Sequence, residues 1–210
     1  MAGSSNDDCI DPESCKNVLI ENCIIHTHDD CVALKAGRDQ DGWPYPPTEN
    51  VIVRNNTFIT EVGSGFCIGS EMSAGVRNVF VENCELIKSG KHAFQFKSNP
   101  DRGGFIENVF MRNIEVGTVK YGFEFTTDYK GWRGNEYFTK YRDFYFQDIL
   151  IKEVTDKSIV IKGRLEEPIR KVYFENCVID QSPQLEVVSE ASQILFENTK
   201  INTNILPTKD

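Results

Sequence analysis

The sequence lacks several features that define common classes of protein. It has no run of about 18 apolar residues, so we expect no membrane-spanning helix. Apolar residues nowhere repeat in a way that indicates an amphipathic helix of 11 or more residues. The net charge of -9 argues against nucleic acid or an anionic membrane as a partner. Residues 1–8 are polar, so this chain shows no signal-peptide core.

Histidine is scarce, and the cysteines do not have the spacing of a metal centre. The chain has three histidines and seven cysteines, an odd number that leaves at least one thiol free. The first four cysteines are six to eight residues apart, unlike the Cys-x-x-Cys pattern of zinc sites. We therefore expect no metal and no cofactor.

A short repeat runs through the whole chain. Seven segments alternate apolar and other residues and end in Asn or, once, Asp; they begin at Val18, Val51, Val79, Val109, Phe144, Val172 and Ile194. Their starts are 22 to 35 residues apart, the spacing of a solenoid. Alternation with a period of two predicts strands, and Asn tolerates the left-handed backbone of a tight bend.

A second and a third short strand follow most of these segments. In the third strand we expect inward stacks of Val32, Phe66, Phe94, Phe123 and Ile159, and of Leu34, Ile68, Phe96, Phe125 and Ile161. Cys23, Cys84 and Cys177 share one column of the second strand, which favours buried thiols over disulfides. The sequence thus predicts an all-β protein, a parallel β-helix of about seven turns, with one domain at residues 1–201 and a tail at 202–210.

Three long loops are expected at residues 37–50, 98–104 and 129–141. Loops on a rigid scaffold often carry binding residues. Trp43, Tyr45, Trp132 and Tyr137 fall in these loops, where they could either stack on sugar rings or pack within the loop.

Two acidic clusters, residues 6–12 and 29–35, lie on successive turns. The strand register makes Asp8 and Asp30 neighbours in a column that continues with Ser64 and His92, and Asp29 lies beside them. Carboxylates this close should raise one pKa, which gives the acid and the base that glycoside hydrolysis needs. Solvated turn aspartates are the alternative, above all for Asp11.

A second column contains Glu13, Lys35, Gly69 and Lys97. Lysines at Lys35, Lys97 and, further along, Lys162 would suit a substrate that carries carboxylates. A solubilising surface is the alternative interpretation.

These residues resemble glycoside hydrolase family 28, the polygalacturonases and their relatives. The family's Asn-Thr-Asp-Gly-x-Asp motif corresponds to residues 6–11, its Asp-Asp pair to Asp29-Asp30, its Gly-His-Gly motif to residues 63–65, and its Arg-x-Lys motif to residues 95–97. The order and separation match across nearly the whole chain. The resemblance implies a right-handed, pectin-lyase-like solenoid that is secreted or periplasmic.

The resemblance also implies an activity and a set of roles. It implies inverting hydrolysis of α-linked galacturonan or a related pectic oligo- or polysaccharide. Asp30 would be the general acid, with Asp8 and Asp29 activating water, and Lys97 would bind a uronate carboxylate. The further substrate-binding candidates are Asn6, Gln95, Ser64, His92 and Lys35.

Four departures from the family pattern stand out. Ser64 replaces the family histidine, Gln95 replaces an arginine that could bind a carboxylate bidentately, and His28 replaces a glycine. The family's catalytic domain also has several turns and a capping segment before the first Asp motif. A chain that lacks them would expose the edge of its first turn, so end-to-end self-association is possible.

Two other classes of function stay open. A carbohydrate-binding β-helix without turnover, either a pseudo-enzyme or a truncated fragment, would fit Ser64 and Gln95, whereas Asp8, Asp29 and Asp30 favour an enzyme. A structural β-helix would need to assemble as a trimer. A β-helix lyase would require a cluster of calcium ligands and an arginine as the base, and the sequence shows neither.

Overall fold

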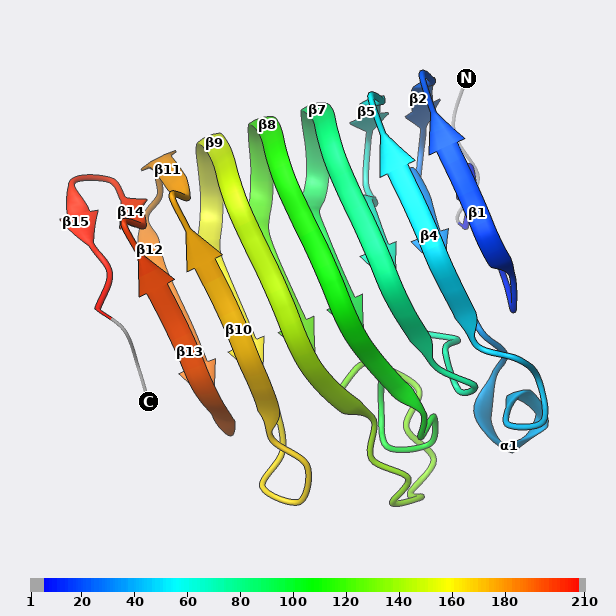
Figure 1. Cartoon of the computed structure of the whole chain (residues 1–210). Coiled ribbons are helices and arrows are strands. Elements are labelled where there is room, and N and C mark those ends of the chain that lie inside the picture. Colours follow the sequence, from blue (N-terminus) through cyan, green and yellow to red (C-terminus); the bar gives the residue numbers. More distant parts are fainter. Residues whose placement is uncertain (1–5, 208–210) are drawn as a thin grey trace.

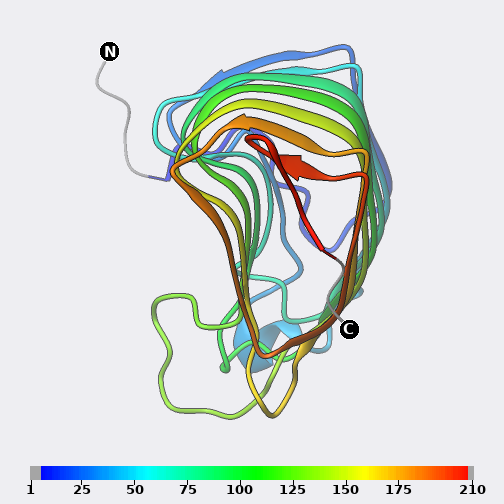
Figure 2. The same cartoon turned by 90° about the vertical axis from the view of Figure 1, so that its left-hand side faces the viewer.

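The computed structural model describes residues 6–207, which form a right-handed parallel β-helix (Figure 1). Each turn contributes strands that pair in parallel with those of the next turn, and together they make one continuous sheet. In Figure 2, viewed along the stack, the coils superimpose around a common interior. Within residues 6–207, no helix is long and apolar enough to cross a membrane.

The described residues form one short helix and fifteen strands. The helix is α1, Asp39–Gly42, and the strands are β1 (Lys16–Glu21), β2 (Ile24–Thr27), β3 (Val32–Leu34), β4 (Thr48–Arg54), β5 (Thr57–Thr60), β6 (Ser64–Ile68), β7 (Val76–Lys97), β8 (Phe105–Thr126), β9 (Lys140–Lys162), β10 (Ile169–Glu175), β11 (Val178–Gln181), β12 (Gln184–Ser189), β13 (Ala191–Glu197), β14 (Lys200–Ile201) and β15 (Asn204–Ile205).

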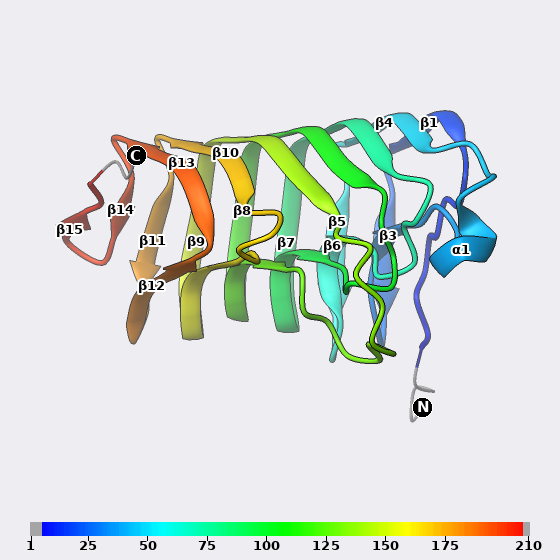
Figure 3. The same cartoon turned by 90° about the horizontal axis from the view of Figure 1, so that it is seen from below.

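The register of the repeat is the one that the sequence predicts. The seven starting residues are paired in succession from turn to turn, as Val18 with Val51 and Val172 with Ile194 illustrate. Figure 3 shows the resulting coils side by side from β1 at one end to β15 at the other. The prediction of a parallel β-helix of about seven turns is confirmed.

Left-handed backbone sits at the end of every repeat. All seven terminal Asn or Asp residues have a positive φ, from 45° at Asn198 to 58° at Asn22. A second row with positive φ, which we did not predict, lies directly before the repeat and includes Asn17, Asn50 and Asn78. The amides of this row bond from turn to turn, with Asn50 Nδ2 3.0 Å from Asn17 Oδ1.

The core consists of columns of apolar side chains, and its centre is aromatic. Phe96 stacks on Phe125 with ring centroids 4.6 Å apart, and Phe144 packs edge-on against both rings. The expected inward stacks that begin at Val32 and Leu34 are buried. The cysteines of the described chain are free thiols; Cys84 and Cys177 are buried as expected, whereas Cys23, on the first turn, is only partly buried.

The ends of the elements differ from the expectation in three places. Strand β9 begins at Lys140, so the third loop is shorter than residues 129–141, and the first loop contains α1 and ends where β4 begins at Thr48. We expected a tail at residues 202–210. Instead, β15 pairs antiparallel with β14, and Leu206 is buried, so the described part of this segment covers the last turn.

Candidate active site

A polar cavity of about 290 Å³ lies on the outer side of the turns that carry β3, β6 and the end of β7. Both acidic clusters, the lysine column and the loop after β8 contribute side chains to it. The described residues that line it are Asn6, Asp8, Asp29, Asp30, Lys35, Val62, Gly63, Ser64, Ser70, Glu71, Lys91, Gln95, Lys97, Tyr129 and Lys130.

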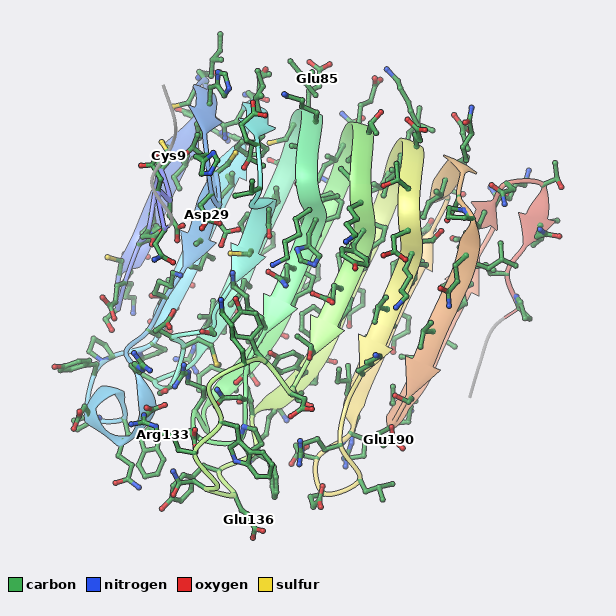
Figure 4. The ribbon with its side chains drawn as sticks, turned by 180° about the vertical axis from the view of Figure 1, so that it is seen from behind. Cys9, Asp29, Glu85, Arg133, Glu136 and Glu190 are labelled. Carbon is green, nitrogen blue, oxygen red and sulfur yellow. The ribbon has the colours of Figure 1, made fainter. Side chains whose placement is uncertain are left out.

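Three carboxylates meet in this cavity. Asp8, Asp29 and Asp30 each place an oxygen within 4.8 Å of the other two. The first turn holds Asp8 because Cys9 N donates to Asp30 O at 3.0 Å, which fixes the register of the two acidic clusters. In Figure 4, Cys9 and Asp29 lie on these first turns. The expected neighbourhood of Asp8 and Asp30 is therefore present.

Gly63 allows the next turn to come close to this carboxylate cluster. A Cβ at Gly63 would lie 2.1 Å from the carbonyl carbon of Asp29, so only glycine fits. The neighbouring Ser64 N donates to Asp30 Oδ1 at 2.7 Å. The glycine of the Gly63-Ser64-Gly65 motif thus places a backbone donor on the Asp30 carboxylate.

Asp30 is buried and fully engaged. Its Oδ2 accepts from Lys97 Nζ at 2.8 Å and from the thiol of Cys67 at 3.1 Å. Burial raises the pKa of Asp30, but the nearby Lys97 ammonium and these hydrogen bonds outweigh it and hold the pKa well below its usual range. Asp30 is therefore an ionised carboxylate at neutral pH, which disfavours the general-acid role that the resemblance implies for it.

The raised pKa that we expected in the cluster belongs to a different carboxyl group. Partial burial, with repulsion from Asp8 and a hydrogen bond to it, raises the pKa of Asp11 to about 6, although the Lys35 ammonium opposes this. Asp11, which we regarded as equally well explained as a solvated turn residue, is thus part of the charge network.

Lys35 lies between three carboxylates. Its Nζ is 3.6 Å from Asp8 Oδ2, 3.9 Å from Asp11 Oδ2 and 3.5 Å from Glu71 Oε2. Its side chain is 14% exposed. Lys35 therefore compensates charge inside the site.

The Asp8, Asp29 and Asp30 oxygens are close enough to share a cation, but the Lys35 and Lys97 ammonium groups already supply positive charge to two of these carboxylates.

Ser64 and His92 occupy the same column on adjacent turns, as the register predicts. His92 is buried, and its Nε2 is 2.8 Å from Glu124 Oε2. Burial lowers the pKa of His92, while the His92 and Gln95 hydrogen bonds lower the pKa of Glu124 to about 2 against its burial. Neutral His92 thus donates from Nε2 to an ionised Glu124. Its Nδ1 lies 3.5 Å from Ser64 Oγ.

Gln95 completes this network. Its Nε2 donates to Glu124 Oε2 at 2.6 Å, and its Oε1 accepts from Ser64 Oγ at 3.3 Å. Sequence reasoning missed Glu124 and Cys67. The strand register could have identified both residues, because each pairs with Gln95 on a neighbouring turn. Each also stands between two inward-facing residues of the third strand, so its side chain points outward, toward the cavity floor.

A second cavity of about 320 Å³ lies next to the first. Lys91, Gln95, Tyr129 and Lys130 line both cavities, so these residues form the boundary between them. The remaining residues that line the second cavity are His92, Tyr121, Glu124, Thr126 and Asp128.

The long loops brace one another next to the site. Trp43 Nε1 donates to Arg102 O at 2.8 Å, and the Trp43 ring packs edge-on against Tyr137 at 4.7 Å. Arg102 and Arg133 both bond to Asp39, and Figure 4 shows Arg133 on the loop between β8 and β9. For Trp43 and Tyr137, packing within the loops is the role that the structure supports.

The chain is thus a parallel β-helix that carries clustered carboxylates and lysines in an outer cavity. The family model described as "Glycosyl hydrolases family 28" matches residues 1–203. The chain therefore belongs to glycosyl hydrolase family 28.

Among curated proteins, the chain is 32% identical over 181 residues to a probable polygalacturonase from Vitis vinifera and 35% identical over 174 residues to an endo-polygalacturonase from Pectobacterium carotovorum subsp. carotovorum. These matches cover 84% and 81% of this chain but only 36% and 40% of the relatives. The chain thus spans well under half of their length.

Among solved structures, the chain is similar to an exopolygalacturonase from Thermotoga maritima. The TM-score is 0.89 at 30% sequence identity, and the match covers 97% of this chain and 46% of that one. A family 28 exopolygalacturonase from Yersinia enterocolitica matches with a TM-score of 0.77 at 22% identity, which supports the fold alone.

Proposed function

We propose that this chain carries the catalytic site of a hydrolase that cleaves α-linked galacturonan or a related pectic polysaccharide. The observation that carries the proposal is the cluster of Asp8, Asp29 and Asp30 in a lysine-lined cavity. The polygalacturonases to which the chain is similar support the substrate class. Such a polymer lies outside the cell, so we also infer a secreted or periplasmic location.

The environments of the three carboxylates suggest separate roles. Asp30 is held ionised by Lys97, and both of its oxygens accept hydrogen bonds, so it supplies negative charge to the site. Asp8 lies 3.6 Å from Lys35 Nζ and is the base that we propose to accept a proton from water. Asp29 has no lysine in salt-bridge contact within residues 6–207, and its two neighbours are carboxylates. We therefore propose Asp29 as the general acid, in place of Asp30.

The separation of the carboxylates bears on the stereochemistry of the reaction. An inverting pair is typically about 6.5–9.5 Å apart and a retaining pair about 5–5.5 Å apart. The nearest oxygens here are within 4.8 Å, so the distance alone does not favour inversion, which rests on the family resemblance. Proton NMR of the first product decides: a β-anomer from the α-linkage supports inversion, and an α-anomer requires a covalent intermediate.

The central experiment incubates the protein with polygalacturonate and with mixed pectic oligosaccharides and follows new reducing ends. We expect the Asp29→Asn and Asp8→Asn variants each to lose at least about a hundredfold in rate, since general acid–base catalysis contributes about 10² to 10⁴. A folded wild-type protein that releases no product from any substrate would refute the hydrolase proposal.

Carbohydrate binding without turnover is the second candidate. The observation that favours it is the uncharged pair Ser64 and Gln95 at positions where the family has ionisable residues. Calorimetry that shows binding of oligogalacturonides by a wild-type chain without hydrolysis would support it.

End-to-end self-association is a separate proposal. Ile10, Val18 and Cys23 belong to the inward columns of the first turn and are only partly buried, whereas Val32 and Val51 on the next turn are fully buried. Light scattering at rising protein concentration tests it, and a monomer at all concentrations would refute it.

A further inference from the structure

The catalytic cavity is lined by four lysines, and two of them already have their charge compensated. Lys97 Nζ is bonded to Asp30, and its side chain is 9% exposed. Lys35 is surrounded by Asp8, Asp11 and Glu71. A substrate carboxylate that approached either lysine would have to compete with a carboxylate of the protein that is already in contact.

The other two lysines of the cavity, Lys91 and Lys130, have no carboxylate of the described part of the chain in direct contact. Lys91 and Lys130 are both exposed, and within residues 6–207 neither forms a salt bridge. Both line the catalytic cavity and also the second cavity. Lys91 has Glu124 as a nearby negative charge, and the Lys130 ammonium lies over the Tyr129 ring, 5.7 Å from its centroid, but neither has a carboxylate in direct contact among the described residues. Both ammonium groups thus stand at the boundary between the two cavities, where a sugar unit that spans them would lie.

Buried polar groups hold the backbones of both lysines. Lys91 N donates to Ser89 Oγ at 3.0 Å, and this hydroxyl donates to Gly63 O at 2.6 Å. Lys130 O accepts from Nδ2 of the buried Asn99 at 3.3 Å. These bonds therefore fix the two backbone positions on the rim from which the exposed lysine side chains extend.

Among the described residues, the floor between the cavities carries no cation that could take this role. Gln95 is uncharged, and Glu124 beneath it is an ionised carboxylate whose pKa is about 2. A uronate carboxylate directed at the floor would meet Glu124, whereas one directed outward would meet Lys91 and Lys130. Charge complementarity thus orients an acidic sugar with its carboxylate toward the rim.

We propose that Lys91 and Lys130 form a carboxylate-binding pair that selects a uronate sugar unit at the junction of the two cavities. This inference rests on the proposed function, since it names the residues that read the acidic group of the same substrate. It also differs from the assignment by resemblance, in which Lys97 binds the uronate.

The test is calorimetric binding of trigalacturonate and of its methyl ester, with Asp29→Asn as the parent protein so that no turnover occurs. We expect Lys91→Gln and Lys130→Gln each to weaken trigalacturonate binding about tenfold, the loss of one hydrogen bond to a charged group. Binding of the ester should change less than about twofold, because it has no carboxylate charge.

Lys152→Gln in the same parent is the matched control. Lys152 is an exposed lysine on β9 that lines neither cavity, so its replacement changes the net charge equally without touching the proposed pair. We expect it to leave both affinities unchanged. Loss of acid binding in this control as large as in the two rim variants would reduce the effect to net charge and overturn the inference.

Three further results would overturn the inference: unchanged acid affinity in both rim variants, equal losses for acid and ester, or no binding of either ligand by the parent. Failure of the proposed function has a different pattern. In that case the wild-type chain releases no reducing ends, while binding of trigalacturonate still depends on Lys91 and Lys130.

Discussion

Lys97 and Asp30 form an ion pair in which both side chains are less than 10% exposed. The Asp30 carboxylate depends on Lys97 because water cannot replace the ammonium at this depth. Lys97 in turn depends on its position at the end of β7, two turns away from Asp30 along the stack. At the residue scale, this pair keeps the buried Asp30 carboxylate ionised.

The first prediction concerns this pair. Lys97→Gln leaves Asp30 buried without its cation, so we expect a loss of about 3 kcal/mol in the free energy of unfolding, measured by urea titration at pH 7. The pKa of Asp30 should rise. Lys152→Gln on the surface is the control and should change the stability by less than about 0.5 kcal/mol. An equal effect of the two substitutions would contradict the importance of the buried pair.

The second prediction is the direction of the pH dependence. Burial lowers the pKa of His92 and the positive charges of Lys91 and Lys97 act in the same direction, whereas the contact with Glu124 opposes them. The unfolded chain therefore binds protons more readily, and the stability from His92 is present above about pH 6.5 and is lost as the pH falls.

Three carboxyl groups also change the stability as the pH falls below about 6.5. The lowered pKa values of Asp30 and Glu124 remove stability as the pH falls below about 4.5, whereas the raised pKa of Asp11 adds stability as the pH falls through about 6. We expect the net unfolding free energy to decline from pH 7 to pH 3. In His92→Gln the part of the decline between pH 6.5 and pH 5 should be smaller, and an identical pH profile would show that His92 does not titrate on unfolding.

At the scale of the elements, rows of residues with left-handed backbone define the corners of each turn. Asn83, with φ of 54°, and Asn113, with φ of 51°, stand at the same corner of successive turns. Asn113 Nδ2 donates to Asn83 Oδ1 at 2.7 Å. Asn serves here because it accepts the backbone conformation and also links each corner to the next.

The third prediction separates these two contributions. Asn113→Ala and Asn113→Gly both remove the amide bond to Asn83, but only alanine meets the steric penalty of positive φ. We expect alanine to be less stable than glycine by about 1 kcal/mol, measured by thermal or urea unfolding. Equal stability of the two variants would show that the corner relaxes out of the left-handed region.

On the scale of the whole molecule, aromatic rings continue the core from turn to turn. Phe125 on β8 contacts Phe96 on β7 and both Phe144 and Phe146 on β9. A matching stack of Phe80, Phe110, Tyr145 and Tyr173 runs along the outer face, where Phe80 is 42% exposed. The inner and outer stacks have similar geometry but differ in burial.

The fourth prediction uses this difference. Phe125→Ala leaves a cavity in a fully buried stack, and we expect it to cost about 3–5 kcal/mol of unfolding free energy. Phe80→Ala on the outer stack should cost about 1 kcal/mol or less, because the removed ring is already in contact with water. Comparable losses in urea titrations of the two variants would contradict a stability that is dominated by the interior.

The repeat made the fold predictable from the sequence. Alternating apolar residues, a terminal Asn and the spacing between segments fix both the strands and their register, because a slip of one residue would expose every inward side chain. The same register placed Asp8 beside Asp30 and Ser64 beside His92 without any knowledge of three-dimensional coordinates.

Which groups carry charge within the site depended on the tertiary structure. The sequence shows that Lys97 and Asp30 exist, but their contact joins residues 67 positions apart through long side chains whose direction no local pattern specifies. The same holds for Glu124 beneath Gln95, for the raised pKa of Asp11, and for the exposed Lys91 and Lys130. Local sequence sets the strands and columns, whereas burial and charge pairing arise only when separate turns stack.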